Sequence, residues 1–411
     1  MNFLRKINLT AVTIYLLIFY AGWQLGHYDI KYQLEHYKPT LDVKNLTPPQ
    51  NKQNLDFKLF WDTWDKVSRE YVDKKAVDPQ KMYYGAIQGM VAALGDPYTF
   101  FLPPDIQKST KEVLGGSFEG VGIQLGFNKD KRLVVIAPLK DTPAARNGIK
   151  AGDFILKVGD KDTTNMTLQE AVSLIRGPKG TKIALEVFHE GDSKTTVISL
   201  TRDTIIVKSV EYESKVTPKG KKIAYIKLSS FGERTPKEWD GAISDALADA
   251  PAGVILDLRN NPGGFLEEAV FIASEFIARG DIVIQEDGQG DQKALKVEKT
   301  GKLLNQPLVA LINKGSASAA EIVAGAIQDY KRGKLVGEQS FGKGTIQSSQ
   351  DLEGGTGIHI TTAKWLTPNE RWIHNIGLTP DIKIDMPASI GQDQKDQKDP
   401  QLEKALELLD Q

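Results

Sequence analysis

The chain has 411 residues and a formal net charge of −1, and 26% of its residues are charged while 40% are hydrophobic. This length allows about two or three domains with cores of their own, and the balanced charge excludes the strongly basic surface typical of nucleic-acid-binding proteins. Because cysteine is absent, disulfides, cysteine nucleophiles and thiolate metal sites are excluded as well. We therefore expect a globular protein that works without nucleic acid, metal ion or other cofactor.

An uncharged and mostly apolar segment, residues 9–25, lies near the N-terminus and follows Arg5 and Lys6. About 20 apolar residues suffice to span a bilayer, and the preceding positive charges favour a cytoplasmic N-terminus. No cleavage site of small residues follows the segment, so we interpret residues 1–28 as a retained signal anchor, and not as a removed signal peptide or a buried core helix. This predicts a membrane-anchored protein whose remaining chain lies in a periplasm, a lumen or the cell exterior.

A linker and a helical region follow the apolar segment. Residues 29–53 are polar and contain prolines, which is typical of a linker. Residues 54–114 are predicted to be helical. The first helix is indicated by apolar residues at helical spacing, which we expect to belong to a core: Phe57, Phe60, Trp61, Trp64, Val67 and Tyr71. A second helix is predicted over residues 79–94, where a Gly-Asp-Pro sequence ends it.

Residues 115–203 change to short strands and turns, with a short helix predicted over residues 143–147 and a second helix over residues 167–176. Their first motif is a glycine-containing loop made of Gly120, Val121, Gly122 and Ile123. A Thr-Pro-Ala-Ala motif follows at residues 142–145 and an Ala-Gly-Asp motif at residues 151–153. Together these motifs resemble a PDZ domain. The resemblance implies that the loop binds the carboxylate of a protein tail through backbone N–H groups, while the next strand pairs with the tail.

Residues 204–390 alternate strands with helices, which favours a mixed layer in which helices pack on a sheet. Strands are predicted over residues 223–228, 253–258, 282–284 and 308–312, and helices over residues 237–248, 266–277 and from 318 onward. Residues 391–411 begin as a polar, repetitive tail and end in a short amphipathic helix. The expected fold class is therefore mixed α/β, with a helical N-terminal segment, a PDZ-like domain and an α/β core.

Three segments of this core carry residues suited to catalysis. Residues 256–264 read LDLRNNPGG, a strand that runs into a turn whose N–H groups can stabilise an oxyanion, although a plain strand–helix connection is the commoner meaning. Residues 315–322 read GSASAAEI and place Ser318 at the start of a helix, where capping is the commoner role of a serine. Residues 341–344 read FGKG, whose apolar and small residues can desolvate Lys343 and so produce a neutral base; an exposed turn lysine is the alternative.

Residues 337–343 also fit the phosphate-binding pattern G-x-x-x-x-G-K. The next residue is Gly344, whereas a phosphate-binding loop needs a serine or threonine there to bind Mg²⁺. A nucleotide-binding function would also leave the apolar N-terminal segment and the PDZ motifs unexplained. We therefore reject this interpretation.

With all these motifs in this order, the chain resembles the carboxyl-terminal processing peptidases, also called tail-specific proteases, over about residues 57–386. The resemblance implies a serine-type endopeptidase with a Ser-Lys catalytic dyad. Ser318 corresponds to the family's nucleophile and Lys343 to its general base. Gln347 corresponds to the residue that orients the lysine.

The resemblance also implies an oxyanion hole. Its donors would be the N–H of Ala319 and that of a glycine in the NPGG turn, for which we favour Gly263 with Gly264 as the alternative. Two departures from the family pattern are modest: Ala320 stands where some members carry a third serine, and residues 367–372 read TPNERW where a TPSGRS-like run is usual. The second departure leaves the fine specificity open.

The predicted function is that of a membrane-anchored endopeptidase that binds the C-terminal tails of protein substrates and cleaves near them. Arg176, at the end of the helix that would flank the bound tail, is predicted to couple tail binding to assembly of the cleft. The rival hypothesis is a non-catalytic PDZ scaffold or adaptor, which would have no need of Ser318, Lys343 and Gln347. The physiological substrate, a homo-oligomeric state and an activating partner protein remain open.

Overall fold

The computed structural model describes residues 56–189, 191–386 and 398–411. The predicted signal anchor, the linker and residues 387–397 of the polar tail lie outside the described residues. The chain forms two compact units, Met1–Asp78 and Pro79–Gln411, which we treat separately. Within the described ranges, no helix is both long and apolar enough to cross a bilayer.

The described part of the first unit contains the helix α2 (Lys58–Glu70). Its aromatic rings contact one another, and the ring centroids of Phe60 and Trp61 lie 5.0 Å apart. No residue of α2 is buried, so our expectation that these aromatics belong to a core is wrong. Helical spacing gathers rings on one face of a helix whether or not another element covers that face.

The second unit begins with α3 (Pro79–Ala92), β1 (Phe100–Leu102) and α4 (Pro104–Leu114). Proline suits the start of both helices, because its fixed φ matches the helix and its missing N–H would have no partner there. Residues 93–99 form the turn between α3 and β1. The Asp96 carboxylate closes this turn by accepting hydrogen bonds from the Tyr98 N–H (3.0 Å) and the Thr99 hydroxyl (2.7 Å).

A small domain lies between β2 (Ser117–Gly120) and β9 (Asp203–Ile206), which pair antiparallel with each other. Its sheet has the strand order β3-β4-β5-β7-β8, with β6 beside β5. A separate hydrophobic core fills it, and the helix α6 (Leu168–Ile175) contributes Ala171 and Ile175 to that core. The remaining elements are β3 (Ile123–Phe127), β4 (Leu133–Pro138), α5 (Pro143–Arg146), β5 (Phe154–Val158), β6 (Lys161–Asp162), β7 (Lys182–Phe188) and β8 (Thr196–Thr201).

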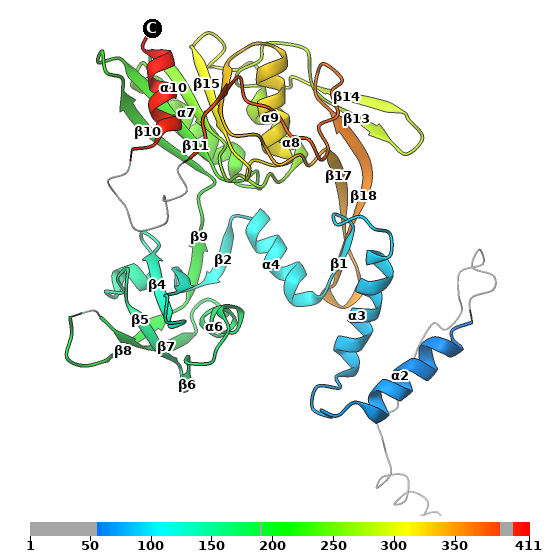
Figure 1. Cartoon of the computed structure of the whole chain (residues 1–411). Helices are drawn as coiled ribbons and strands as arrows, with labels where there is room; N and C mark the ends of the chain where they lie inside the picture. Colours follow the sequence, from blue (N-terminus) through cyan, green and yellow to red (C-terminus); the bar gives the residue numbers. More distant parts are fainter. Residues whose placement is uncertain (1–55, 190, 387–397) are drawn as a thin grey trace, which may run out of the picture. The chain divides into compact units, whose positions relative to one another are not determined.

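The centre of the larger domain is a six-stranded sheet of order β10-β11-β12-β15-β16-β19, in which only the edge strand β10 runs antiparallel to its neighbour. One face packs against α7, α8 and α9, and the other against the C-terminal helix α10 (Figure 1). Because both faces are covered, β12 and β15 are buried along their whole length. The bounds are β10 (Val210–Val216), β11 (Lys222–Leu228), α7 (Thr235–Ala248), β12 (Gly253–Asp257), α8 (Leu266–Ala273), β15 (Leu308–Ile312), α9 (Ala319–Asp329), β16 (Lys334–Gly337), β19 (Ile382–Lys383) and α10 (Pro400–Leu409).

A second sheet has the order β1-β18-β13-β14, and β17 pairs with residues 357–364 of β18 along the other edge of that strand. Our sequence analysis did not predict β17 (Thr345–Asp351) or β18 (Gly357–Leu366), because β17 reads TIQSSQD and lacks apolar alternation. The sheet brings β1, from the N-terminal third, against the C-terminal third of the chain (Figure 1). The remaining elements are β13 (Asp281–Asp287), β14 (Gln292–Lys296) and the short helix η1 (Glu353–Gly355).

Candidate active site

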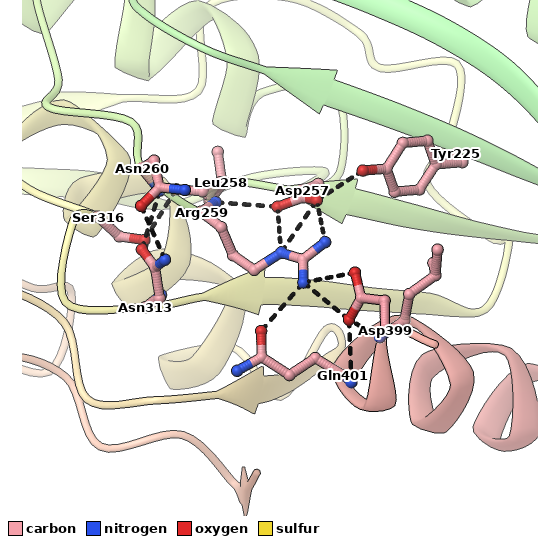
Figure 2. Close-up of polar contacts among 10 residues, drawn as sticks. Tyr225, Asp257, Leu258, Arg259, Asn260, Asn313, Ser316, Asp399 and Gln401 are labelled. Carbon is pink, nitrogen blue, oxygen red and sulfur yellow. Dashed lines mark hydrogen bonds and ion pairs between the residues drawn. The ribbon is translucent and has the colours of Figure 1, made fainter. Parts of the chain in front are cut away.

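Two turns meet at the carboxyl ends of the neighbouring parallel strands β12 and β15, which is where open α/β sheets place their sites. The first turn, residues 258–264, follows β12, and the second, residues 313–318, follows β15. They interlock through hydrogen bonds: the Ser316 hydroxyl donates to the Leu258 carbonyl (2.8 Å), and the Ala317 N–H donates to the Asn261 carbonyl (2.9 Å). Asn260 and Asn313 add two more bonds between the turns, each 2.9 Å long (Figure 2). The glycine-rich turn and the serine turn are therefore one rigid assembly.

Ser318 stands at the junction between the second turn and α9, in a strained backbone conformation. Its φ of 56° and ψ of −116° lie in a region that residues other than glycine rarely adopt, at a cost of about 1–3 kcal/mol. The Ser318 N–H donates to the Glu321 carboxylate at 2.8 Å, and the Glu321 N–H donates to the Ser318 carbonyl at 2.8 Å. The surrounding structure thus holds a serine at a helix start, in a geometry typical of a functional residue.

Glu321 joins the serine turn to the lysine loop. Its side chain is fully buried, and its carboxylate also accepts hydrogen bonds from the Ser340 hydroxyl (2.6 Å), the Gly342 N–H (2.7 Å) and the Lys343 N–H (2.9 Å). Burial raises the pKa of this carboxyl, while the hydrogen bonds act in the opposite direction. A single side chain therefore fixes the backbone of Lys343 relative to that of Ser318.

Lys343 is half-buried, and burial lowers the pKa of its amine. The negative charges of Asp96 and Glu321 oppose that shift. The Lys343 Nζ lies 5.1 Å from the centroid of the Tyr98 ring. Among the hydrogen bonds of the described residues, none joins this amine to the Ser318 hydroxyl. The structure therefore holds the two groups in one site with the amine directed to the Tyr98 ring.

Gln347 follows on β17 and is part of the same site. Its amide Nε2 donates hydrogen bonds to the hydroxyls of Thr345 and Thr361, both at 3.0 Å. In the part of the chain that the structure describes, Gln347 makes no hydrogen bond to Lys343. The two threonines, which the sequence analysis did not single out, hold this side chain in place.

The predicted oxyanion donors border Ser318 closely. A Cβ atom at Gly263 would lie 2.8 Å from the Ser318 Cβ, and one at Gly264 would lie 2.0 Å from the Phe231 carbonyl oxygen, so both positions require glycine. The Gly263 N–H already donates to the Asn261 Oδ1 at 2.8 Å. Across the described residues, the N–H groups of Gly264 and Ala319 have no such acceptor. These two N–H groups are therefore the ones free to bind an anion.

One cavity of about 570 Å³ collects these groups. Ser318, Ala319, Lys343, Gln347 and Gly264 line it. Much of the remaining wall is apolar and includes Ile106 and Val113 of α4, together with Phe265, Leu266, Ile322, Ile346 and Trp365. Such a cavity offers a nucleophile, a base, N–H donors and space for an apolar side chain.

The structure adds residues that our motif analysis missed. His359 lines the same cavity, and its Nε2 lies 3.0 Å from the hydroxyl of Ser349; burial and the charge of Lys343 lower the pKa of this imidazole. Asp96 and Tyr98 come from the turn that we had interpreted only as a helix end. No local signal in the sequence reveals these three residues, because the pairing of β18 with β1 and β17 brings them to the site.

Arg259 anchors the start of the glycine-rich turn to the C-terminal segment. Its guanidinium binds the buried Asp257 carboxylate through Nη2 (2.6 Å) and Nε (2.9 Å), and Asp257 also accepts from the Tyr225 hydroxyl (2.6 Å). The Arg259 Nη1 reaches Asp399 (2.8 Å) and the Gln401 Oε1 (3.1 Å) at the start of α10 (Figure 2). The last helix of the chain is thus tied to the site by charged hydrogen bonds.

The predicted tail-binding loop lies at the junction of β2 and β3. Gly122 has a φ of 77°, and a Cβ there would lie 2.4 Å from Thr142, so this turn also requires glycine. Val121 is buried in the core of the small domain, while Gly120 ends β2 and Ile123 begins β3. The loop therefore stands at the edge where a PDZ domain receives its ligand.

Arg176 lies directly after α6, in the small domain. Its Nη1 binds the Glu112 carboxylate of α4 at 2.7 Å, and its guanidinium lies 4.6 Å from the centroid of the Phe118 ring. Because α4 also lines the cavity that contains Ser318 and Lys343, Arg176 contacts a helix that borders this cavity.

Comparison with known proteins identifies three segments. Residues 222–384 match the model of peptidase family S41, residues 108–188 match the PDZ domain, and residues 18–105 match the N-terminal domain of the activating protease CtpB. The carboxy-terminal processing protease CtpA of Bacillus subtilis is 39% identical over 325 residues, which cover 79% of this chain and 68% of that protein. The carboxyl-terminal-processing protease of Synechocystis is 36% identical over 360 residues, which cover 87% of this chain and 84% of that protein.

A solved structure agrees with the fold. A crystal structure from Bacteroides fragilis, described as an S41 protease, covers 89% of this chain and 99% of its own with a TM-score of 0.54. Its sequence identity is 15%, so this likeness supports the fold alone.

Proposed function

Because the chain belongs to the carboxyl-terminal processing peptidases, serine-type proteases of family S41 with a PDZ domain, we propose that Ser318 is its nucleophile and Lys343 its general base. The observation that carries the proposal is one cavity that is lined by a strained serine, a half-buried lysine and two residues whose N–H groups have no acceptor among the described residues. Gln347 completes the set and orients the lysine once substrate is bound.

The reaction is acyl transfer to the serine. Neutral Lys343 takes the proton of the Ser318 hydroxyl while the Ser318 Oγ forms a bond to the carbonyl carbon of the scissile peptide. The ammonium of Lys343 then protonates the leaving amine, and water hydrolyses the acyl-enzyme with the same lysine as base. The burial that lowers the pKa of Lys343 favours the neutral amine that this step needs.

The N–H groups of Ala319 and Gly264 hold the oxyanion of the tetrahedral intermediate. Gly263 can replace Gly264 only if its N–H leaves the Asn261 side chain. Loss of one such donor typically lowers kcat by about 10²–10³. Ala319 is the first residue of α9, so the field of that helix N-terminus adds to the stabilisation of the oxyanion.

The loop Gly120–Val121–Gly122–Ile123 binds the C-terminal carboxylate of the protein substrate, and the edge of β3 pairs with the tail. Arg176 couples this event to the cleft through Glu112, because that ion pair links the end of α6 to the α4 wall of the cavity. The substrate tail would then reach Ser318 with its C-terminal end directed to the small domain.

Residues 1–28 anchor the enzyme in a membrane, with the protease domain outside the cytoplasm. This proposal rests on the uncharged apolar segment that follows Arg5 and Lys6. Two C-terminal fusions test this proposal: one to an alkaline phosphatase that is active only outside the cytoplasm, and one to a reporter that is active only inside it. Phosphatase activity in the membrane fraction supports the anchor. If only the fusion to the cytoplasmic reporter is active, the anchor is refuted.

Cleavage of an unfolded protein by the full-length enzyme in detergent tests the assignment of the dyad. Ser318→Ala and Lys343→Ala should each abolish cleavage, whereas the exposed control variants Ser244→Ala and Lys237→Ala should cleave at the wild-type rate. If cleavage persisted in the first two variants, the dyad would be wrong. If no variant and no wild-type preparation cleaved while all bound C-terminal peptides, the rival tail-binding adaptor would be favoured.

A further inference from the structure

The turn between α3 and β1 lies against the proposed base. Tyr98 presents its ring to the Lys343 Nζ at 5.1 Å from the ring centroid, and a cation at this distance is attracted by the face of an aromatic ring. The negative charge of Asp96, two residues earlier in the same turn, opposes the burial that lowers the pKa of Lys343, although no ion pair of the described residues joins the two side chains. Both residues lie outside residues 222–384, the segment that matches the peptidase model.

Hydrogen bonds fix this turn relative to the rest of the site. The Asp96 carboxylate accepts from the Thr99 hydroxyl (2.7 Å), and the Thr99 Oγ1 accepts from the Thr361 N–H of β18 (2.9 Å). The Thr361 Oγ1 in turn accepts from the Gln347 amide (3.0 Å). The turn and the proposed orienting residue Gln347 therefore share one network, and the position of Asp96 is set by the sheet.

The charged and titratable groups that face Lys343 come from four elements. Glu321 belongs to α9, and its carboxylate accepts hydrogen bonds from four donors around the site. Asp96 and Tyr98 belong to the turn, and His359 belongs to β18. His374, in the segment after β18, acts electrostatically on Asp96 and lies with its ring centroid 6.0 Å from that of Tyr98. The Asp96 carboxylate accepts hydrogen bonds from Tyr98 and Thr99 of its own turn, so its position follows that of the turn.

We propose that the ring of Tyr98 holds the protonated amine of Lys343 in the substrate-free enzyme, that the Asp96 carboxylate of the same turn adds its negative charge, and that the turn thereby controls when Lys343 becomes the catalytic base. The inference rests on the proposed role of Lys343 and assigns a positioning function to a turn far from the catalytic motifs in sequence. The ring face and the carboxylate attract an ammonium but have little attraction for a neutral amine. Loss of the proton to solvent therefore frees the amine to reach Ser318 and accept its hydroxyl proton.

Asp96→Asn in the full-length enzyme tests the charge. The amide can still accept the Tyr98 N–H, so the turn is preserved, but the attraction for the ammonium is lost. Neutral Lys343 then forms at lower pH, and the acidic limb of kcat/KM against pH, which reports the free enzyme, shifts to lower pH. At a fixed pH on that limb we expect kcat/KM for a quenched fluorescent peptide to rise about threefold or more. The exposed control Asp240→Asn should leave the limb unchanged.

A second pair of variants keeps the inference testable if Asp96→Asn fails to fold. Tyr98→Phe retains the ring face and should retain the wild-type limb, whereas Tyr98→Leu removes it and should shift the limb to lower pH. Thr99→Val breaks the same hydrogen-bond network but keeps both the Asp96 charge and the Tyr98 ring, so it should lower the rate and move the limb less than Asp96→Asn does. His359→Gln should also leave the limb in place, which separates lysine titration from histidine titration.

The outcomes separate this inference from the proposed dyad. A limb that coincides with the wild type in both Asp96→Asn and Tyr98→Leu would overturn the role of the turn while leaving the dyad intact. Cleavage by Ser318→Ala or Lys343→Ala would overturn the dyad itself, whatever the position of the limb. A limb that moves equally in Asp96→Asn and Thr99→Val would also count against the inference, because it would indicate a general disturbance of the site.

Discussion

Replacing Glu321 with glutamine should damage both the stability and the activity of the enzyme. The buried carboxylate accepts four hydrogen bonds: Oε1 accepts from the Ser340 hydroxyl and the Gly342 N–H, and Oε2 accepts from the N–H groups of Ser318 and Lys343. A glutamine side chain can replace only one of these oxygens as acceptor, so two buried donors would face an NH₂ group. Each unpaired donor costs about 1–3 kcal/mol, and relief of the buried charge offsets part of this, which leaves a net loss of about 2–4 kcal/mol.

Urea denaturation of Glu321→Gln, followed by tryptophan fluorescence, measures the loss of stability, and cleavage of an unfolded protein measures kcat. We expect kcat to fall well beyond the fraction of unfolded enzyme, because the carboxylate sets the positions of the Ser318 and Lys343 backbones. The isosteric substitution Glu211→Gln, at an exposed position of β10, is the matched control and should be neutral. A Glu321→Gln enzyme with the wild-type urea midpoint and the wild-type kcat would refute the role of Glu321 as the link between the two catalytic segments.

Four further outcomes are expected. Gly264→Ala should lower stability in urea by about 2 kcal/mol or more and abolish cleavage, because its Cβ would lie 2.0 Å from the Phe231 carbonyl oxygen. Asp399→Ala removes both an acceptor of Arg259 and the N-cap of α10. Hydrogen exchange of the α10 amides should therefore accelerate and kcat should fall, whereas unchanged exchange would contradict this expectation. Leu409 of α10 lies in the core between that helix and the central sheet, so Leu409→Ala should lower the free energy of unfolding in a denaturant titration by about 2–5 kcal/mol, while kcat at low temperature stays near wild type. Burial lowers the pKa of Lys343, so the unfolded chain keeps this proton to higher pH than the folded protein does. The stability of the wild type should therefore rise with pH between that lowered pKa and about 10.5, the ordinary pKa of lysine. Lys343→Met should lack this rise.

The sequence predicted the central strands β12 and β15, which are buried on both faces, but it missed the polar strand β17. β12 and β15 were recognised because their apolar runs are short and continuous, as parallel strands in the middle of a covered sheet require. β17 is polar and pairs only with β18, so it carries no apolar pattern, although it holds Gln347. The aromatic spacing of α2 predicted the helix correctly and its burial wrongly, since spacing reports which face is apolar and not what covers it.

The comparisons confirm the family, the mixed α/β fold with its PDZ domain and the serine-peptidase class that the motifs indicated. The individual site residues stay predictions. The structure nevertheless places Ser318, Ala319, Lys343 and Gln347 around one cavity, as the order of the motifs led us to expect. What the motifs could not indicate are contacts made through the second sheet. The turn that contains Asp96 and Tyr98 was interpreted from sequence only as a helix end, whereas the pairing of β1 with β18 brings this turn to the site, where the Tyr98 ring faces the Lys343 amine.

The strain at Ser318 explains why so many separate segments are needed to build this site. A serine at a φ of 56° costs about 1–3 kcal/mol. Formation of α9 does not offset this cost, because the helix could begin equally well at a residue with an ordinary φ. Other contacts must therefore stabilise the strained conformation. The bonds from Ser316 and Ala317 to the glycine-rich turn hold the strained turn on one side, and Glu321 holds it on the other. Glu321 keeps these partners only while the Lys343 loop is in place, so the nucleophile conformation and the position of the base depend on each other. Disordering the lysine loop should therefore relax the Ser318 backbone as well, so the proposed nucleophile and the proposed base would lose their geometry in the same step.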